Sequence, residues 1–115
     1  MKKLCFYVPE RFLEPVKDAV FAAGAGQLGR YDRCCWQVQG IGQFRPMPGS
    51  RPFLGREQVQ EQVSEYRVEM LCEDSCIASV LSALVEAHPY EEPAWDVTDV
   101  LAPSGVSRSS DGCSP

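Results

Sequence analysis

Two hydrophobic periods alternate along this chain, and their order limits the folds open to it. The clearest alternation lies at residues 65–72, where every second side chain is apolar and most of those between are charged. The apolar positions are Tyr66, Val68, Met70 and Cys72, and the charged ones are Glu65, Arg67 and Glu69. This period of two predicts a strand with one buried face. The spacing then becomes helical, with an apolar stripe at Ile77, Val80, Leu81 and Leu84.

The same pair of patterns opens the chain. A first strand is predicted where Leu4, Phe6 and Val8 alternate with Lys3, Cys5 and Tyr7, and Pro9 ends it. A helical stripe follows, made of Leu13, Val16, Ala19, Val20 and Ala23. We expect Gly24 and Gly26 to stop this helix, because glycine accepts the positive φ that helix ends often need.

The remaining segments complete the order of elements. A strand is predicted from residue 34, with Cys34, Trp36 and Val38 facing one way and Cys35, Gln37 and Gln39 the other. Gly40 and Gly42 suggest a bulge or a close backbone approach, and residues 46–56 predict a long hairpin loop.

Local signals also mark the second helix and the chain end. Asp74 or Ser75 is expected to cap the helix, and Pro89 to end it near Ala87. A last strand is predicted from Trp95 to about residue 101. The composition of residues 103–115 predicts a disordered tail, which leaves residues 1–102 as one domain.

The predicted order is therefore β-α-β-β-α-β. Because crossovers are right-handed as a rule, this order predicts an α+β, ferredoxin-like split βαβ sandwich. It has a four-stranded antiparallel sheet with two helices on one face. The other face would be open and polar, either solvated or part of a wet oligomer interface. It would carry Cys5, Tyr7, Cys35, Gln37, Gln39, Glu65, Arg67 and Glu69.

Charge and composition exclude several classes of function. The net charge is -5 and the eleven Lys and Arg are scattered, so no nucleic-acid partner is expected. No apolar stretch approaches the roughly 20 residues of a membrane span. Residues 9–11 also interrupt any signal-peptide core, which predicts a cytoplasmic protein without a membrane partner. Six cysteines without a C-x-x-C pair indicate reduced thiols rather than disulfides.

The densest polar chemistry lies at residues 88–93, His-Pro-Tyr-Glu-Glu-Pro, at a helix-to-strand junction. His88 continues the helical stripe. It is therefore either a histidine packed at a helix C-terminus, where positive charge suits the dipole, or a ligand or metal contact. Zinc needs three or four protein ligands, so a metal site at His88, Glu91 and Glu92 would have to be shared between subunits. Otherwise both glutamates are expected to be exposed, and Tyr90 to pack or form hydrogen bonds at an interface.

A glycine-rich segment at residues 24–29 matches G-x-G-x-x-G. It follows a helix and precedes a strand, the reverse of a dinucleotide fingerprint. The glycines are expected mainly to turn the chain, but their N–H groups could also form an anion nest helped by Arg30, Arg33 and Arg45. Aromatic residues that could stack on a ligand, core packing being the simpler role, are Trp36, Phe44 and Trp95. The predicted ligand-binding set is Gly24, Gly26, Gly29, Arg30, Tyr31, Trp36, Phe44, Arg45 and Tyr90.

Several motifs together resemble one family. They are Val8-Pro9, Gly24-Ala25-Gly26, Gly29-x-Tyr31-Asp32, Trp36, Gly40-x-Gly42-x-Phe44-x-Pro46, Glu65-Tyr66-Arg67-x-Glu69 and His88-Pro89-Tyr90-Glu91-Glu92-Pro93-Ala94. Over residues 4–98 the pattern resembles the domain inserted in the middle of YqfO-type proteins, the Nif-three-like dinuclear-metal family, and the short stand-alone versions of that domain. The resemblance implies a PII/CutA-like fold and a homo-oligomer, with a trimer favoured.

The resemblance does not carry over the dinuclear-metal chemistry. In the full-length family that site lies in two flanking segments rich in His, Asp and Glu, and neither is part of this sequence. The leading hypothesis is a non-enzymatic oligomeric module that binds a small anionic ligand or a protein. The alternative is a metal-binding protein with a divalent ion shared between subunits at His88, Glu91 and Glu92. An enzyme is a third interpretation, for which no nucleophile–base pair is visible.

Overall fold

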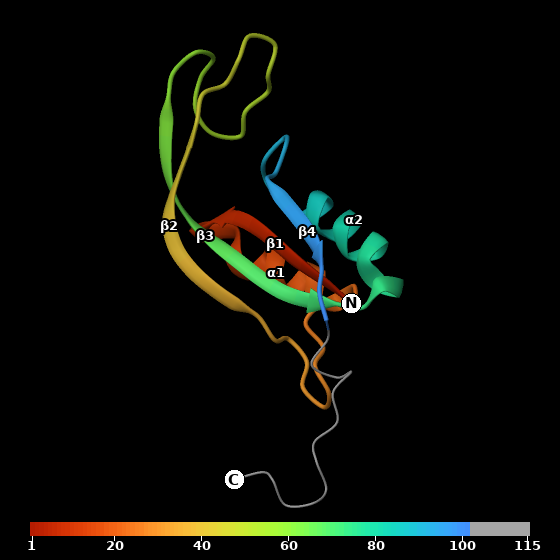
Figure 1. Ribbon diagram of the computed structural model, residues 1–115. Coiled ribbons are helices and arrows are strands. Elements are labelled where there is room, and N and C mark those ends of the chain that lie inside the picture. Colours follow the sequence, from red (N-terminus) through yellow and green to blue (C-terminus); the bar gives the residue numbers. More distant parts are fainter. Residues whose placement is uncertain (102–115) are drawn as a thin grey trace, which may run out of the picture.

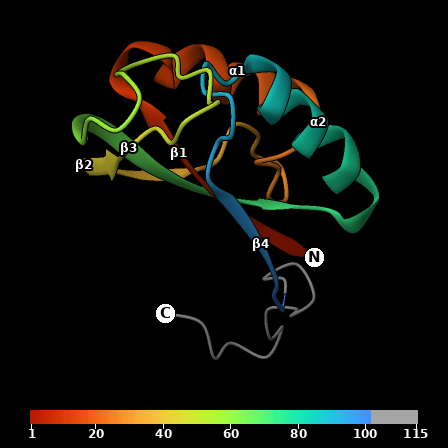
Figure 2. The same ribbon diagram turned by 90° about the horizontal axis from the view of Figure 1, so that it is seen from above.

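The computed structural model describes residues 1–101, which form one four-stranded sheet and two main helices (Figures 1 and 2). In chain order the elements are β1 (Lys2–Pro9), α1 (Leu13–Ala22), β2 (Trp36–Phe44), β3 (Glu61–Cys72), α2 (Ile77–Ala87) and β4 (Trp95–Asp99). The predicted β-α-β-β-α-β order and the ferredoxin-like α+β fold are confirmed. The tail predicted at residues 103–115 lies outside the described residues. Within residues 1–101, no helix is long and apolar enough to cross a membrane.

The sheet has the order β2-β3-β1-β4, and every neighbouring pair is antiparallel. Figure 2 shows both helices on the same side of it. Beneath them lie the fully buried side chains of Leu4, Phe6, Val8, Val16, Val20, Val68, Val80 and Leu84. Burying each such side chain contributes roughly 1.5–3 kcal/mol. The apolar faces predicted from the two periods therefore form the core.

The helix α1 ends at two glycines, as predicted. Gly24 and Gly26 have φ values of +117° and +81°, a region that glycine enters without steric cost. The N–H of Gly26 donates to the carbonyl of Leu71 (2.8 Å), and the Gly26 carbonyl accepts the N–H of Cys34 (2.8 Å). Gly26 therefore ties the loop after α1 to β3.

The two ends of α2 differ in how well the sequence predicted them. Its last residue is Ala87, and His88 is extended (φ -74°, ψ 137°), as the following proline requires. The cap expected at Asp74 or Ser75 is wrong, because Cys76 is at the N-cap and no side chain caps the helix. The Asp74 carboxylate instead pairs with the N-terminal amine, 2.9 Å away.

The register of β2 reverses the predicted faces of that strand. Trp36 pairs with Glu69, and directly opposite residues of an antiparallel pair point to the same face. Trp36 and Val38 therefore lie on the open face, where they are 59% and 44% exposed. Gln37, expected on the open face, lies on the helix side, and its amide oxygen accepts a hydrogen bond from Lys17 Nζ (2.9 Å).

Three other residues near β2 also depart from prediction. Gln39 pairs with Tyr66 and so joins Gln37 on the helix side. Cys34 and Cys35 precede β2 instead of belonging to it, and Cys35 packs against the core although it was expected to face outward. The open face is therefore less polar than the sequence predicts, because two apolar side chains of β2 replace two glutamines.

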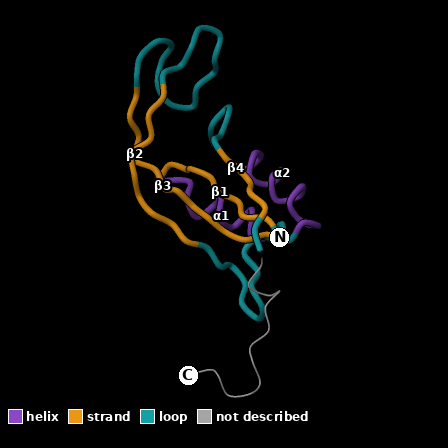
Figure 3. The backbone as a smooth tube through the Cα atoms, in the orientation of Figure 1, coloured by secondary structure: helices purple, strands orange, loops and turns teal. Residues whose placement is uncertain are grey.

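The strands β2 and β3 form a long hairpin that extends beyond the other two strands (Figures 1 and 3). They pair without interruption along the whole of β2, so the bulge suggested by Gly40 and Gly42 is not formed. Gly42 instead leaves room for a side chain, since a Cβ there would lie 2.0 Å from Glu65 Oε1. The connecting loop at residues 45–60 lies at the far end of this hairpin (Figure 3).

Candidate functional site

His88 is buried, with 6% of its surface exposed, between α2 and the segment that leads to β4. Its Nε2 lies 2.6 Å from the carbonyl oxygen of Tyr7, and its Nδ1 accepts the N–H of Tyr90 (3.1 Å). Because Nδ1 is an acceptor, the ring proton is on Nε2 and the imidazole is neutral. The pairing of β1 with β4 stops at Phe6. His88 thus supplies a partner for the next carbonyl of β1.

Burial lowers the pKa of His88, and the hydrogen bond to the Tyr7 carbonyl opposes this shift. The packed histidine predicted at the helix end is present. The positive charge expected to complement the helix dipole is not, because removing the ring from water disfavours its charged form. His88 is a neutral link between β1 and the segment at residues 88–94.

Tyr90 extends this arrangement toward the long hairpin. Its ring centroid lies 4.8 Å from that of His88 and 6.1 Å from that of Phe44. Its hydroxyl donates to Glu65 Oε2 at 3.4 Å. Burial, with Glu65 nearby, raises the pKa of Tyr90 to about 12, and burial also raises the pKa of Glu65. The phenol therefore stays protonated near neutral pH and holds the half-buried carboxyl beside Gly42.

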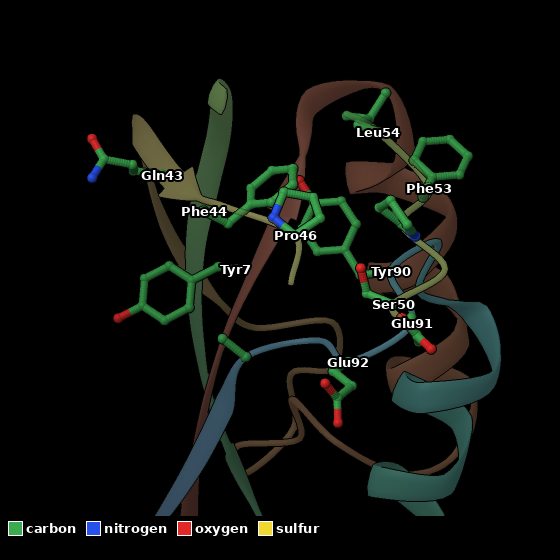
Figure 4. A pocket seen from close by; sticks show the side chains of 12 residues that line it. Tyr7, Gln43, Phe44, Pro46, Ser50, Phe53, Leu54, Tyr90, Glu91 and Glu92 are labelled. Carbon is green, nitrogen blue, oxygen red and sulfur yellow. The ribbon is translucent and has the colours of Figure 1, made fainter. Parts of the chain in front are cut away.

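A pocket of about 250 Å³ lies where the loop at residues 45–60 faces the segment at residues 88–94 (Figure 4). Its lining comes from β1, the end of β2, the loop and the segment before β4. The lining residues are Tyr7, Gln43, Phe44, Pro46, Ser50, Pro52, Phe53, Leu54, Tyr90, Glu91, Glu92 and Ala94. An apolar hollow with a few polar groups is the usual form of a small-molecule site.

The two carboxylates of the sequence motif lie at this pocket with different partners. Glu91 Oε1 accepts the N–H of Arg51 (2.8 Å), which joins the hairpin loop to the segment before β4. Glu92 is exposed, as predicted, and forms no ion pair with any residue that the structure describes. Glu91 therefore helps to hold the pocket together, while the Glu92 carboxylate is free to meet a ligand.

The geometry of one chain does not favour a metal at this position. Nowhere in residues 1–101 do three His, Cys, Asp or Glu side chains gather to hold an ion. Both ring nitrogens of His88 are engaged, so an ion would have to displace a contact to Tyr7 or Tyr90. The shared site at His88, Glu91 and Glu92 stays a prediction.

The predicted ligand-binding residues fall into two groups near the two ends of β2. One group is Gly24, Gly26, Gly29, Arg30, Tyr31 and Trp36, and the other is Phe44, Arg45 and Tyr90. Because β2 has nine residues, its ends are roughly 25–30 Å apart. In the first group the N–H groups of Gly24, Gly26 and Tyr31 donate to carbonyls of the protein itself. This leaves little of the anion nest that the sequence suggested, and Arg30 and Tyr31 are exposed.

The residues that the hairpin loop contributes to the pocket, above all Phe53 and Leu54, are not among those predicted from the sequence. Their signal was two neighbouring apolar residues in a polar, proline-rich segment. Phe53 also packs edge-on against Phe12, with ring centroids 5.4 Å apart, so the loop is anchored to the body of the protein. Glu65 was missed because its contact with Tyr90 depends on long-range register.

Known proteins are similar to this chain over most of its length. No family model matches it. A GTP cyclohydrolase 1 type 2 homolog of Mycobacterium leprae is 45% identical over 105 residues, which cover 91% of this chain and 27% of that protein. The Bacillus subtilis protein of the same name is 41% identical over 100 residues, covering 87% and 27%. The chain thus spans about a quarter of the length of the curated relatives that it matches.

Solved structures agree with these relatives. A Bacillus cereus protein related to NIF3 superposes with a TM-score of 0.72 and 38% identity, over 84% of this chain and 24% of that one. The CutA divalent cation tolerance protein of Archaeoglobus fulgidus superposes with a TM-score of 0.61, over 87% and 84% of the two chains. At 14% identity it shows only that the fold is shared. The chain therefore belongs to the Nif-three-like (YqfO-type) family, in which it is homologous to the domain with the PII/CutA-like fold.

Proposed function

We propose that this chain is a non-enzymatic, oligomeric binding module whose pocket at residues 45–60 and 88–94 holds a small molecule. The observation that carries the proposal is the pocket, a hollow of about 250 Å³ with the rings of Tyr7, Phe44 and Tyr90 in its lining. Such pockets bury most of a small ligand in apolar contacts and use few polar groups to orient it.

The fixed walls of the pocket support a binding role. His88 holds Tyr90 against β1, Tyr90 holds Glu65, and Glu91 holds the backbone of Arg51. A pre-formed site loses less conformational freedom when a ligand binds. His88 and Tyr90 are occupied by these structural contacts, so we assign neither of them to acid–base chemistry.

Exposed edges of the sheet support the oligomeric part of the proposal. β2 is an edge strand, and all its residues from Trp36 to Ile41 are exposed. Ile41 is 76% exposed and Trp36 59%. An unpaired edge with apolar side chains favours pairing with another chain. We infer a homo-oligomer, and the resemblance to PII and CutA proteins makes a trimer the specific expectation.

Ligand binding can be tested by native mass spectrometry of the untagged chain, followed by an amide NMR screen of small aromatic compounds. We expect compounds that bind to shift the amides of residues 43–54 and 90–94. Leu54→Ser should weaken their binding, whereas Val59→Ser should not. Val59 is as exposed as Leu54, at 37%, and lies in the same loop but outside the lining. Equal binding by the two variants would contradict the proposal.

The assembly can be tested by light scattering during gel filtration. We expect wild-type protein at three times the chain mass of 12.8 kDa. Ile41→Arg places a charge on the edge strand and should release monomers that remain folded. A wild-type protein that is monomeric at all accessible concentrations would refute the oligomeric part of the proposal. It would not contradict ligand binding in the pocket.

A further inference from the structure

The charged side chains at the pocket are all negative. Glu91 and Glu92 line it, and Glu65 lies behind the Tyr90 hydroxyl. Among the described residues that line it, none is Lys, Arg or His. Arg45 and Arg51 are exposed and adjacent in sequence to lining residues, but neither belongs to the lining. An anion would enter this hollow beside carboxylates and without a counter-charge, which is unfavourable.

The hydrogen-bonding groups of the lining are mostly acceptors. The Ser50 hydroxyl donates to the Met47 carbonyl (2.6 Å), and the Tyr90 hydroxyl donates to Glu65. The amide of Gln43 and the hydroxyl of Tyr7 point away from the other labelled side chains in Figure 4. The Glu92 carboxylate accepts no hydrogen bond from a residue that the structure describes, and an ionised carboxylate only accepts. A ligand that donates hydrogen bonds therefore fits better than one that accepts them.

Aromatic rings complete the arrangement. Tyr7, Phe44, Phe53 and Tyr90 all contribute to the lining, and Figure 4 shows their rings around the hollow with Glu92 at its lower rim. The face of an aromatic ring attracts cations, and rings grouped around one volume recognise ammonium groups. A carboxylate at the rim adds a charge-assisted hydrogen bond for a ligand that carries N–H groups.

We propose that the ligand of this pocket is an organic cation, a protonated amine or quaternary ammonium group on a compact apolar or aromatic body. The apolar body occupies the hollow between the hairpin loop and Tyr90, and the positive group lies near Glu92. This inference rests on the proposed function and adds the charge of the ligand. The charge proposed here is opposite to that of the small anionic ligand expected from the glycine-rich segment.

Three probes of one shape and different charge test the inference on the 115-residue chain. They are phenethylamine, phenethyl alcohol and 3-phenylpropionate, which near neutral pH carry one positive charge, no charge and one negative charge. Amide NMR titration gives the Kd and the location of each. We expect the amine to bind most tightly and the acid most weakly. Glu92→Gln should weaken amine binding about fivefold, the effect of one exposed ion pair, and should leave alcohol binding unchanged.

Two matched variants control for other electrostatic effects. Glu86→Gln removes the same charge from an exposed position on α2, away from the pocket, and should leave amine binding unchanged. Arg45→Gln removes a cation that is next to two lining residues in sequence and should not weaken binding of any probe. Tighter binding of 3-phenylpropionate, lost in Arg45→Gln, would overturn the inference in favour of an anion. Binding of all three probes with equal Kd, or amine binding unaffected by Glu92→Gln, would also overturn it. If no probe shifts the pocket amides, the proposed function itself fails.

Discussion

Replacement of His88 tests the junction on which the pocket depends. His88→Ala removes the hydrogen bonds to the Tyr7 carbonyl and from the Tyr90 N–H, each contributing about 1 kcal/mol. The cavity left by the buried ring adds about 1–2 kcal/mol. We therefore expect the free energy of unfolding to fall by about 3–4 kcal/mol, measured by urea denaturation. In a domain of this size, that loss lowers the Tm by more than about 10 °C.

Two conservative variants divide this effect between the two ring nitrogens. His88→Gln can keep a donor for the Tyr7 carbonyl, and His88→Asn can keep an acceptor for the Tyr90 N–H. Each should recover about 1 kcal/mol relative to His88→Ala. Glu86→Ala, at an exposed position of the same helix, should change stability by less than about 0.5 kcal/mol. A loss below about 1 kcal/mol in His88→Ala would refute the structural role of the histidine.

The pH dependence of stability gives an independent check. Because burial lowers the pKa of His88 below 6.5, the unfolded chain binds its proton first as the pH falls. The stability contributed by the neutral ring is therefore complete above pH 6.5 and is lost as the pH falls through the folded-state pKa. Glu65 has the opposite sign, since its raised pKa stabilises the fold below pH 4.5 and this effect is lost at higher pH. The difference between wild type and His88→Gln isolates the histidine, and a difference that does not change between pH 8 and pH 5 would refute this reasoning.

Two glycine pairs provide further tests. Gly42→Ala should displace Glu65, whose Oε1 would lie 2.0 Å from the new Cβ, and should lower stability by about 1 kcal/mol and weaken ligand binding. At Gly40 a new Cβ would have open space, so Gly40→Ala should change stability by less than about 0.5 kcal/mol. If the two variants had equal urea midpoints and equal Kd values in ligand titrations, the role of Gly42 would be refuted. Gly26→Ala combines a φ of +81° with a Cβ 2.7 Å from a buried ring and should cost about 2–4 kcal/mol. Gly29→Ala, with φ +59° and no neighbour within 4 Å, should cost only about 1 kcal/mol, and thermal unfolding of the pair would show whether the contact matters.

Much of the fold could be predicted because it depends on local pattern. The clear alternation of β3 identifies both a strand and its buried face, since Val68 and Met70 are buried beneath the helices while Arg67 and Glu69 lie on the open face of the sheet. In β2 the same reasoning fails. Because this edge strand is exposed on both faces from Trp36 to Ile41, the alternation of apolar and polar residues at its start does not report which face is buried. A shift of one residue moves every side chain to the other face. The exposed Trp36 is the clearest consequence.

The candidate site shows the same division. The sequence indicated that residues 88–94 form a junction and that His88 continues a buried stripe, and the structure places the ring there. Its neutral state could not be inferred from its position at a helix end, because burial of the ring lowers its pKa even though the hydrogen bond to the Tyr7 carbonyl opposes this shift. Phe44 and Tyr90 were predicted as ligand residues separately, without a reason for them to meet.

The sequence by itself determined the order of the elements, the glycine end of α1 and the proline end of α2, because each depends on residues within a few positions of one another. Tertiary structure alone decided the face on which Trp36 lies, the contact of Glu65 with Tyr90, and the pocket that brings Phe53 toward Glu92. These depend on pairing between strands and on a long loop anchored at Phe12 and Glu91. Such contacts join residues far apart in the chain, as the bond from His88 to Tyr7 does across 81 positions, and no periodicity in the sequence encodes them.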